Sequence, residues 1–76
     1  MNKIIEILNN IRPEFDFAKE GDFIENGLLD SFDIVTLVSD LDNEFGVSID
    51  GADILPENFN SIEAIQNILT KSGAKL

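Results

Sequence analysis

The sequence predicts an all-α fold, a small antiparallel helix bundle with three main helices and one short helix. Apolar residues recur at helical spacing around residues 2–11, 31–45 and 61–71, and the FDF segment over 15–17 is too short to indicate a strand. We expect the 76 residues to form a single domain, 1–76. A domain of this size buries only about 60% of its unfolded surface, so it cannot hold both a core and a deep catalytic cleft.

The first helix is predicted over residues 2–11 and is followed by a long loop over 12–30. Pro13 ends the helix because proline disfavours a helical conformation in the residue before it. A loop longer than about 15 residues is uncommon unless it is functional or anchored by its own side chains. The apolar side of the helix is Ile4, Ile5, Leu8 and Ile11. The candidate anchors that would hold an ordered loop across the core are Phe15, Phe17, Phe23, Ile24, Leu28 and Leu29.

The second helix is predicted over residues 31–45. Asp30 or Ser31 can cap its first turn, and Asp33 adds negative charge where the helix dipole is positive. Gly46 suits the residue after the helix because glycine accepts a left-handed conformation. With an advance of about 100° per residue, one arc of this helix faces the core. That arc consists of Ile34, Leu37, Val38, Leu41 and Phe45.

The last helix is predicted over residues 61–71. Asn60 and Glu63 have the spacing of a capping box, and Ser61 is a competing cap. A short helical turn is expected around residues 51–58. The apolar stripe of the last helix is Ile62, Ile65, Ile68 and Leu69.

The net charge excludes several classes of partner. Fifteen acidic and five basic residues give −10, a field that repels nucleic acid and attracts basic protein surfaces. The 43% content of hydrophobic residues is too high for a disordered acidic tail. Residues 1–11 have the pattern of neither a signal peptide nor a membrane span. We therefore expect a folded cytoplasmic monomer without membrane insertion.

The composition also excludes most catalysis. The sequence has no cysteine and no histidine, hence no thiolate and no imidazole base. The context of Ser31, L-D-S-F-D, is not the G-x-S-x-G elbow of a hydrolase, so we expect no enzyme. The DLDNEFG segment starts like a calcium loop, but Phe45 and Gly51 replace the required glycine and glutamate. No specific metal site is predicted.

The second helix has a smaller apolar strip beside Ser31. Phe32 and Val35 fall outside the core arc, on the side where Ser31 projects. They could pack under the long loop, or they could dock a partner whose basic rim meets nearby acids. In the second interpretation the candidate partner-binding residues are Phe32, Asp33, Val35, Thr36, Ser39 and Asp42.

Two roles stay open for Ser31 from its position alone. It could be an N-cap, worth about 1 kcal/mol. It could also accept a phosphate ester, since the free N–H groups and positive dipole end of a helix N-terminus suit phosphate.

Residues 27–49, GLLDSFDIVTLVSDLDNEFGVSI, resemble the central block of the acyl carrier proteins and of the related peptidyl and D-alanyl carrier proteins. The resemblance covers nearly the whole chain, including its length and the order of helix, long loop, helix, short helix and helix. The shared elements are Asp30-Ser31, the apolar helix after them, Glu44-Phe45 at its end, and the pair Val47 and Ile49.

The resemblance implies that Ser31 carries 4′-phosphopantetheine, transferred from coenzyme A by a phosphopantetheinyl transferase. Asp30 would belong to the motif that this enzyme recognises. The thiol of the attached group would hold an acyl or aminoacyl cargo as a thioester and deliver it to loading, condensing or transfer enzymes with basic surfaces. The chain would thus be a non-catalytic phosphoprotein whose cofactor supplies the thiol that its sequence lacks.

Three positions depart from the commonest pattern of this family. Phe32, Thr36 and Asn43 stand where leucine, glutamate and an acid are usual. The GLLDSF segment is instead similar to D-alanyl carrier proteins and to stand-alone carriers of secondary-metabolite systems. The cargo stays open among fatty-acid, polyketide, nonribosomal-peptide and D-alanylation pathways. The alternative function is an acidic helical interaction module, in which Ser31 is only a helix cap.

Overall fold

The computed structural model describes residues 3–19 and 21–75, and this part of the chain contains helices and loops but no strand. The three α-helices are α1 (Lys3–Ile11), α2 (Ser31–Phe45) and α3 (Ile62–Lys71), and the two short 3-10 helices are η1 (Gly51–Asp53) and η2 (Pro56–Asn58). The predicted all-α class is confirmed. The single helical turn expected around 51–58 is two separate turns, and the expected start of the first helix at residue 2 lies outside the described residues.

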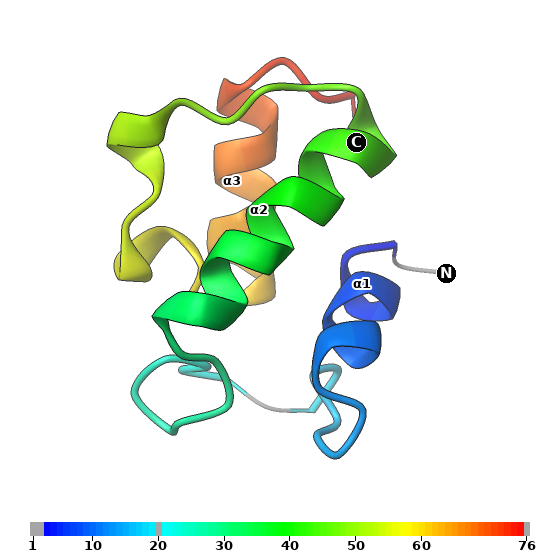
Figure 1. Ribbon diagram of the computed structural model, residues 1–76, viewed down its shortest axis with the longest axis vertical. Helices are drawn as coiled ribbons and strands as arrows, with labels where there is room; N and C mark the ends of the chain where they lie inside the picture. Colours follow the sequence, from blue (N-terminus) through cyan, green and yellow to red (C-terminus); the bar gives the residue numbers. More distant parts are fainter. Residues whose placement is uncertain (1–2, 20, 76) are drawn as a thin grey trace.

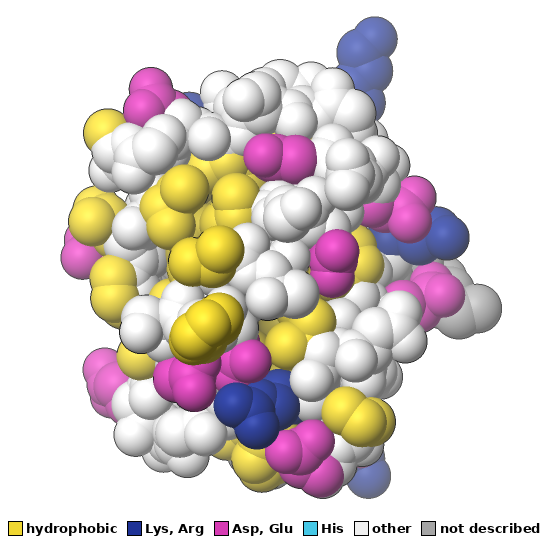
Figure 2. Space-filling view, in the orientation of Figure 1, with side chains coloured by type: hydrophobic (Ala, Val, Ile, Leu, Met, Phe, Trp, Pro, Cys, Tyr) yellow, Lys and Arg dark blue, Asp and Glu magenta, His cyan; other side chains and the backbone are white. Residues whose placement is uncertain are grey.

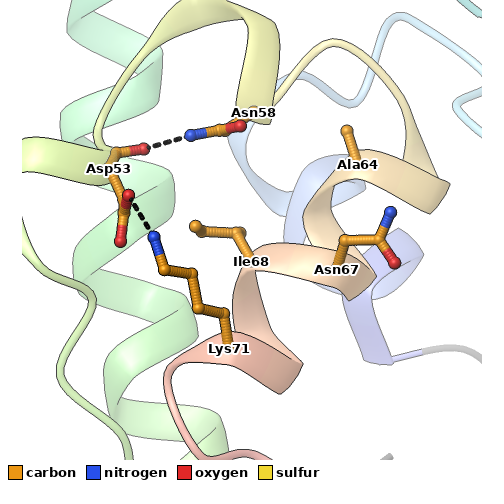
Figure 3. Close-up of a pocket in the computed structure, with 6 residues that line it drawn as sticks. All are labelled: Asp53, Asn58, Ala64, Asn67, Ile68 and Lys71. Carbon is orange, nitrogen blue, oxygen red and sulfur yellow. Dashed lines mark hydrogen bonds and ion pairs between the residues drawn. The ribbon is translucent and has the colours of Figure 1, made fainter.

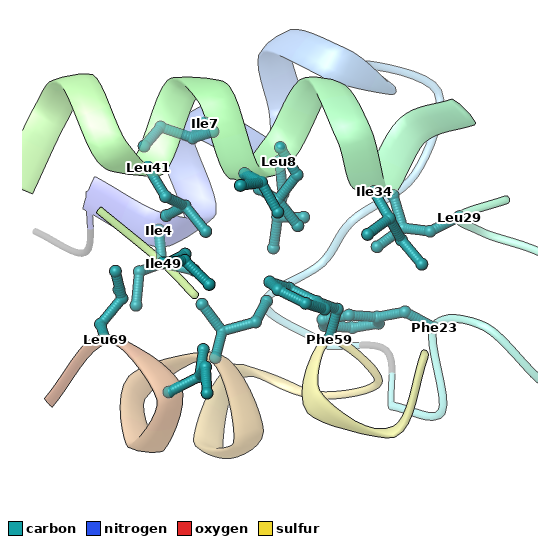
Figure 4. Close-up of a cluster of buried hydrophobic side chains, with 14 of the residues drawn as sticks. Ile4, Ile7, Leu8, Phe23, Leu29, Ile34, Leu41, Ile49, Phe59 and Leu69 are labelled. Carbon is teal, nitrogen blue, oxygen red and sulfur yellow. The ribbon is translucent and has the colours of Figure 1, made fainter. Parts of the chain in front are cut away.

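The three α-helices enclose one hydrophobic core. α1 packs against α2 and α3, and η2 packs against α3 (Figure 1). Side chains from all three helices and from the loops point toward one another (Figure 4). On α1 the buried residues include Ile7, whereas Ile5 is only half-buried, so the predicted stripe of this helix was partly wrong. The predicted arc of α2 is confirmed at Ile34, Leu37, Val38 and Leu41, which are buried, and Phe45 packs at the core edge.

The long loop between α1 and α2 is anchored by its own aromatic side chains. Phe17 and Phe23 are fully buried, with ring centroids 5.1 Å apart in an edge-to-face arrangement. Leu28 and Leu29 are also buried, just before α2. Burying these side chains fixes the loop across the core, as predicted, and brings its last residues to the start of α2.

The structure decides between the two candidate caps of α3 and confirms the predicted end of α2. Ser61 caps α3, since its hydroxyl accepts a hydrogen bond from the N–H of Ala64 at 3.1 Å. Asn60 is therefore not the cap. It binds the long loop instead, accepting the N–H of Phe23 on its backbone oxygen and that of Ile24 on its side-chain oxygen. Gly46 ends α2 in the predicted left-handed conformation, with φ 64°.

No described helix has both the length and the apolar character needed to cross a membrane. Within the described residues, no three acidic side chains are grouped so as to hold a metal ion.

The charge of −10 leads to a prediction about salt. Self-repulsion destabilises a compact state, and salt screens it. We expect moderate sodium chloride, or millimolar divalent cation, to raise the melting temperature by several degrees. A gain of about 1 kcal/mol corresponds to about 4–8 °C for a domain of this size. Thermal unfolding followed by circular dichroism measures the effect, and an unchanged or lower melting temperature in salt would show that repulsion is not limiting.

Candidate functional site

Ser31 is the first residue of α2, and the residue before it caps the helix. Asp30 has an extended backbone, and its Oδ1 accepts the N–H of Asp33 at 2.9 Å. In return, Asp33 Oδ2 accepts the N–H of Asp30 at 3.2 Å, which completes a reciprocal capping box. The helix cap is therefore Asp30, and the interpretation of Ser31 as the cap is wrong.

The side chain of Ser31 is exposed at the first turn of α2, and no residue among those described forms a hydrogen bond with its hydroxyl. The Asp30 side chain already accepts the N–H of Asp33, the third residue of the helix. The Ser31 hydroxyl therefore takes no part in the cap. An exposed, unengaged hydroxyl at a helix N-terminus fits an ester to a phosphate group, which the free N–H groups and helix dipole favour.

Sequence reasoning missed Arg12 as a member of this site. Its Nε donates to Asp33 Oδ2 at 2.8 Å, and its Nη1 and Nη2 each lie 3.5 Å from a carboxylate oxygen, of Glu14 and Asp30 respectively. The hydrogen bond and negative charge of Asp33 raise the pKa of Arg12. The only available signal was that Arg12 is the sole arginine of the sequence.

The predicted apolar strip of α2 faces solvent. Phe32 is 82% exposed and Val35 is 64% exposed, so the alternative that they pack under the long loop is wrong. Thr36 and Ser39 are exposed along the same helix. Figure 2 shows hydrophobic side chains gathered over the first half of α2 and the adjacent η1–η2 segment, beside acidic side chains.

Two acids of the candidate partner-binding set have internal partners. Asp33 has a side chain that is only 14% exposed, and it belongs to the capping box. Asp42 is half-buried, and its Oδ1 accepts the N–H of Ile49 at 3.1 Å, which holds the chain as it leaves α2. Both acids add to the negative charge of the protein, but both side chains also accept hydrogen bonds within the protein.

A separate open cleft of about 270 Å³ lies between η1, η2 and α3 (Figure 3). Lys71 Nζ donates to Asp53 Oδ1 at 2.8 Å, and Asn58 donates its side-chain N–H to the backbone oxygen of Asp53. The hydrogen bond and charge of Asp53 raise the pKa of Lys71 above its ordinary value of 10.5. These contacts fasten η1 to η2 and α3. None of the lining residues comes from α2, so the cleft is not part of the Ser31 site.

Comparisons with known proteins agree on one family. Residues 2–67 match the family model described as "Phosphopantetheine attachment site". A D-alanyl carrier protein of Leuconostoc mesenteroides subsp. mesenteroides is 37% identical over 60 residues, which cover 78% of this chain and 77% of that protein. No solved structure gives a significant match to the chain. The chain therefore belongs to the family of phosphopantetheine-binding carrier proteins, whose cofactor is covalently attached 4′-phosphopantetheine.

Proposed function

We propose that this protein is an acyl or aminoacyl carrier and that Ser31 is the residue to which 4′-phosphopantetheine is attached. One observation carries the proposal: the Ser31 hydroxyl is exposed and unengaged at the first turn of α2, in a chain of the phosphopantetheine-binding family. When attached, the group supplies a thiol that can hold an acyl cargo as a thioester. The sequence itself has no cysteine to do so.

In the attachment reaction the carrier, coenzyme A and the transferase have different roles. The Ser31 oxygen forms a bond to the phosphorus next to the pantetheine of coenzyme A, and the pyrophosphate P–O bond breaks. Adenosine 3′,5′-bisphosphate leaves, and the hydroxyl proton passes to a base. We assign that base to the transferase, because this chain has no histidine and the two acids beside Ser31, Asp30 and Asp33, already accept hydrogen bonds in the capping box. Asp30 fixes the backbone of Ser31 and is part of the surface that the transferase meets.

For the cargo we propose a small aminoacyl group, with D-alanine as the first candidate. The support is the identity to the Leuconostoc mesenteroides subsp. mesenteroides D-alanyl carrier protein together with the GLLDSF segment at the attachment site. The protein would act as a cytoplasmic monomer that receives its cargo from a loading enzyme and yields it to a transfer enzyme.

The interaction-module alternative has less support than the carrier function. It gave Ser31 the role of the cap of α2, and that role belongs to Asp30. The exposed strip of Phe32 and Val35 fits equally well a carrier that must dock with the enzymes it serves.

The intact mass of the protein tests the proposed function. Incubation with coenzyme A and a promiscuous phosphopantetheinyl transferase should add the mass of one phosphopantetheine group. Subsequent incubation with ATP, D-alanine and a D-alanine-activating ligase should add one alanyl group, which hydroxylamine should release because the link is a thioester. Absence of any addition with several transferases would reject the carrier function. Addition of phosphopantetheine without loading of alanine would reject only the cargo.

The exposed strip of α2 leads to a prediction about transfer. Partner surfaces combine a small apolar centre with a charged rim, and here Phe32 and Val35 supply the centre. We expect Phe32→Ala and Val35→Ala to lower kcat/KM for loading by about tenfold each, the size of a contact worth more than 1 kcal/mol. Loading rates under subsaturating carrier measure the effect.

Gln66→Ala is the matched control for this strip, because Gln66 is an exposed residue of α3 and lies outside the proposed contact. Its loading rate should equal that of wild type. Equal rates for all three variants would show that the partner does not contact this part of α2.

A further inference from the structure

Arg12 connects the end of α1 to the start of α2. It follows α1 directly, yet it hydrogen-bonds Asp33, 21 residues later, and lies near the Asp30 carboxylate. Arg12 also lies 3.5 Å from the Glu14 carboxylate, and the ion pairs between described residues that do not involve Arg12 join Lys3 to Glu44 and Lys71 to Asp53, away from this site. Arg12 is thus the basic group that faces the two acids on either side of Ser31. Below the start of α2, Figure 2 shows a basic patch among acidic side chains.

The oxygen that Arg12 binds is also part of the capping box. Asp33 Oδ2 accepts the Nε–H of Arg12 at 2.8 Å and the backbone N–H of Asp30 at 3.2 Å. The position of this carboxylate therefore depends on both donors. The Arg12 guanidinium lies within 3.5 Å of the Asp30 and the Asp33 carboxylate. Two negative charges repel each other, so a cation in contact with both offsets that repulsion.

We propose that Arg12 is a positioning residue for the attachment of phosphopantetheine, which it supports by holding Asp30 and Asp33 around Ser31. Ser31 lies between the two halves of the box, so its backbone conformation follows theirs. Arg12 also offsets negative charge where the transferase must bring the pyrophosphate of coenzyme A, itself an anion. The inference rests on the proposed function and adds a residue to it. Arg12 acts through the two acids and does not contact the reacting atoms.

The planar guanidinium of arginine allows the positioning role of Arg12 to be tested separately from its positive charge. Arg12 approaches Asp33 through Nε and Asp30 through Nη2, so one rigid group engages both carboxylates. Lysine has the same charge but presents a single ammonium on a flexible stem. Arg12→Lys should therefore leave the box loose although the net charge is unchanged.

Two measurements on Arg12→Gln and Arg12→Lys test the inference. The first is transfer of phosphopantetheine from coenzyme A at moderate salt, with kcat and KM for the carrier determined separately. We expect kcat to fall on the order of tenfold in both variants, the size of loss that follows a small misplacement of a reacting group. Lys3→Gln is the matched control, since it removes one positive charge at the far end of α2, and its kcat should equal that of wild type.

The second measurement needs no cofactor. Amide hydrogen exchange in the unmodified protein should be faster at Asp33, whose N–H bonds to Asp30, in both Arg12 variants. Exchange at Ala64, in the equivalent cap of α3, should stay unchanged.

The outcomes separate this inference from the proposed function. Unchanged exchange at Asp33 and unchanged kcat in both variants, with wild type fully modified, would overturn the inference alone. Wild-type kcat and wild-type exchange at Asp33 in Arg12→Lys would also overturn the inference, since a positive charge at this position would then be sufficient. Wild type that accepts no phosphopantetheine would overturn the proposed function and this inference with it.

Discussion

Ser31→Ala should accept no phosphopantetheine while keeping the free energy of unfolding within about 0.5 kcal/mol of wild type. The hydroxyl is the proposed nucleophile, so its removal leaves nothing to form the ester. The fold should be spared because Asp30, not Ser31, caps α2, and because no described residue hydrogen-bonds the Ser31 hydroxyl. A serine that capped the helix would instead cost about 1 kcal/mol on truncation.

Two matched variants accompany Ser31→Ala. Ser48→Ala removes another exposed hydroxyl, after the end of α2 and outside the candidate partner-binding set, and it should be modified as fast as wild type. Asp30→Ala removes the true cap, and it should lose about 1 kcal/mol of stability. Intact mass spectrometry and urea unfolding measure both quantities. Modification of the Ser31→Ala protein would move the attachment site elsewhere, and a stability loss as large as that of Asp30→Ala would contradict the assignment of the cap.

Leu41→Ala should destabilise the protein by about 2–5 kcal/mol, whereas Phe32→Ala should change stability by less than about 0.5 kcal/mol. The two residues lie on the same helix, and both substitutions remove a large apolar side chain. Leu41 is fully buried, so its truncation leaves a cavity and removes dispersion contacts. Phe32 is 82% exposed and buries little area to lose.

Urea unfolding of the two variants side by side measures this contrast. A domain of this size has little stability to spare, so Leu41→Ala could be unfolded before any denaturant is added. Ile34→Val is a milder probe of the same buried face, with an expected loss of about 0.5–1.5 kcal/mol. If Phe32→Ala were as destabilising as Leu41→Ala, Phe32 would be a core residue and the exposed strip would not exist.

Local patterns were sufficient to predict α2 and its buried face, but they left open whether Phe32 and Val35 are exposed. The spacing of Ile34, Leu37 and Leu41 depends only on helix geometry, so the buried side follows from the sequence alone. The cap was also within reach. Asp30 and Asp33 stand three residues apart, as in a capping box, and this spacing distinguishes Asp30 from Ser31 as the N-cap.

Contacts between distant segments could not be predicted in the same way. The pairing of Arg12 with Asp33 depends on the path of the long loop, which burial of Phe17 and Phe23 determines. For a related reason the sequence left Asn60 and Ser61 as competing caps of α3. The spacing of Asn60 from Glu63 suits a cap, but the long loop donates two backbone N–H groups to Asn60, and Ser61 caps α3. A local rule cannot weigh a competing partner 36 residues away.

The double contact of Asn60 with Phe23 and Ile24 has a kinetic consequence. The contact joins positions that are 36 residues apart in sequence, and the segment between them contains all of α2. Closing a segment of that length costs chain entropy before any contact compensates for it. We therefore expect the contact to form after the transition state of folding, so that weakening it would chiefly accelerate unfolding. The segment before Ser31 would then be among the first to open when the native protein begins to unfold.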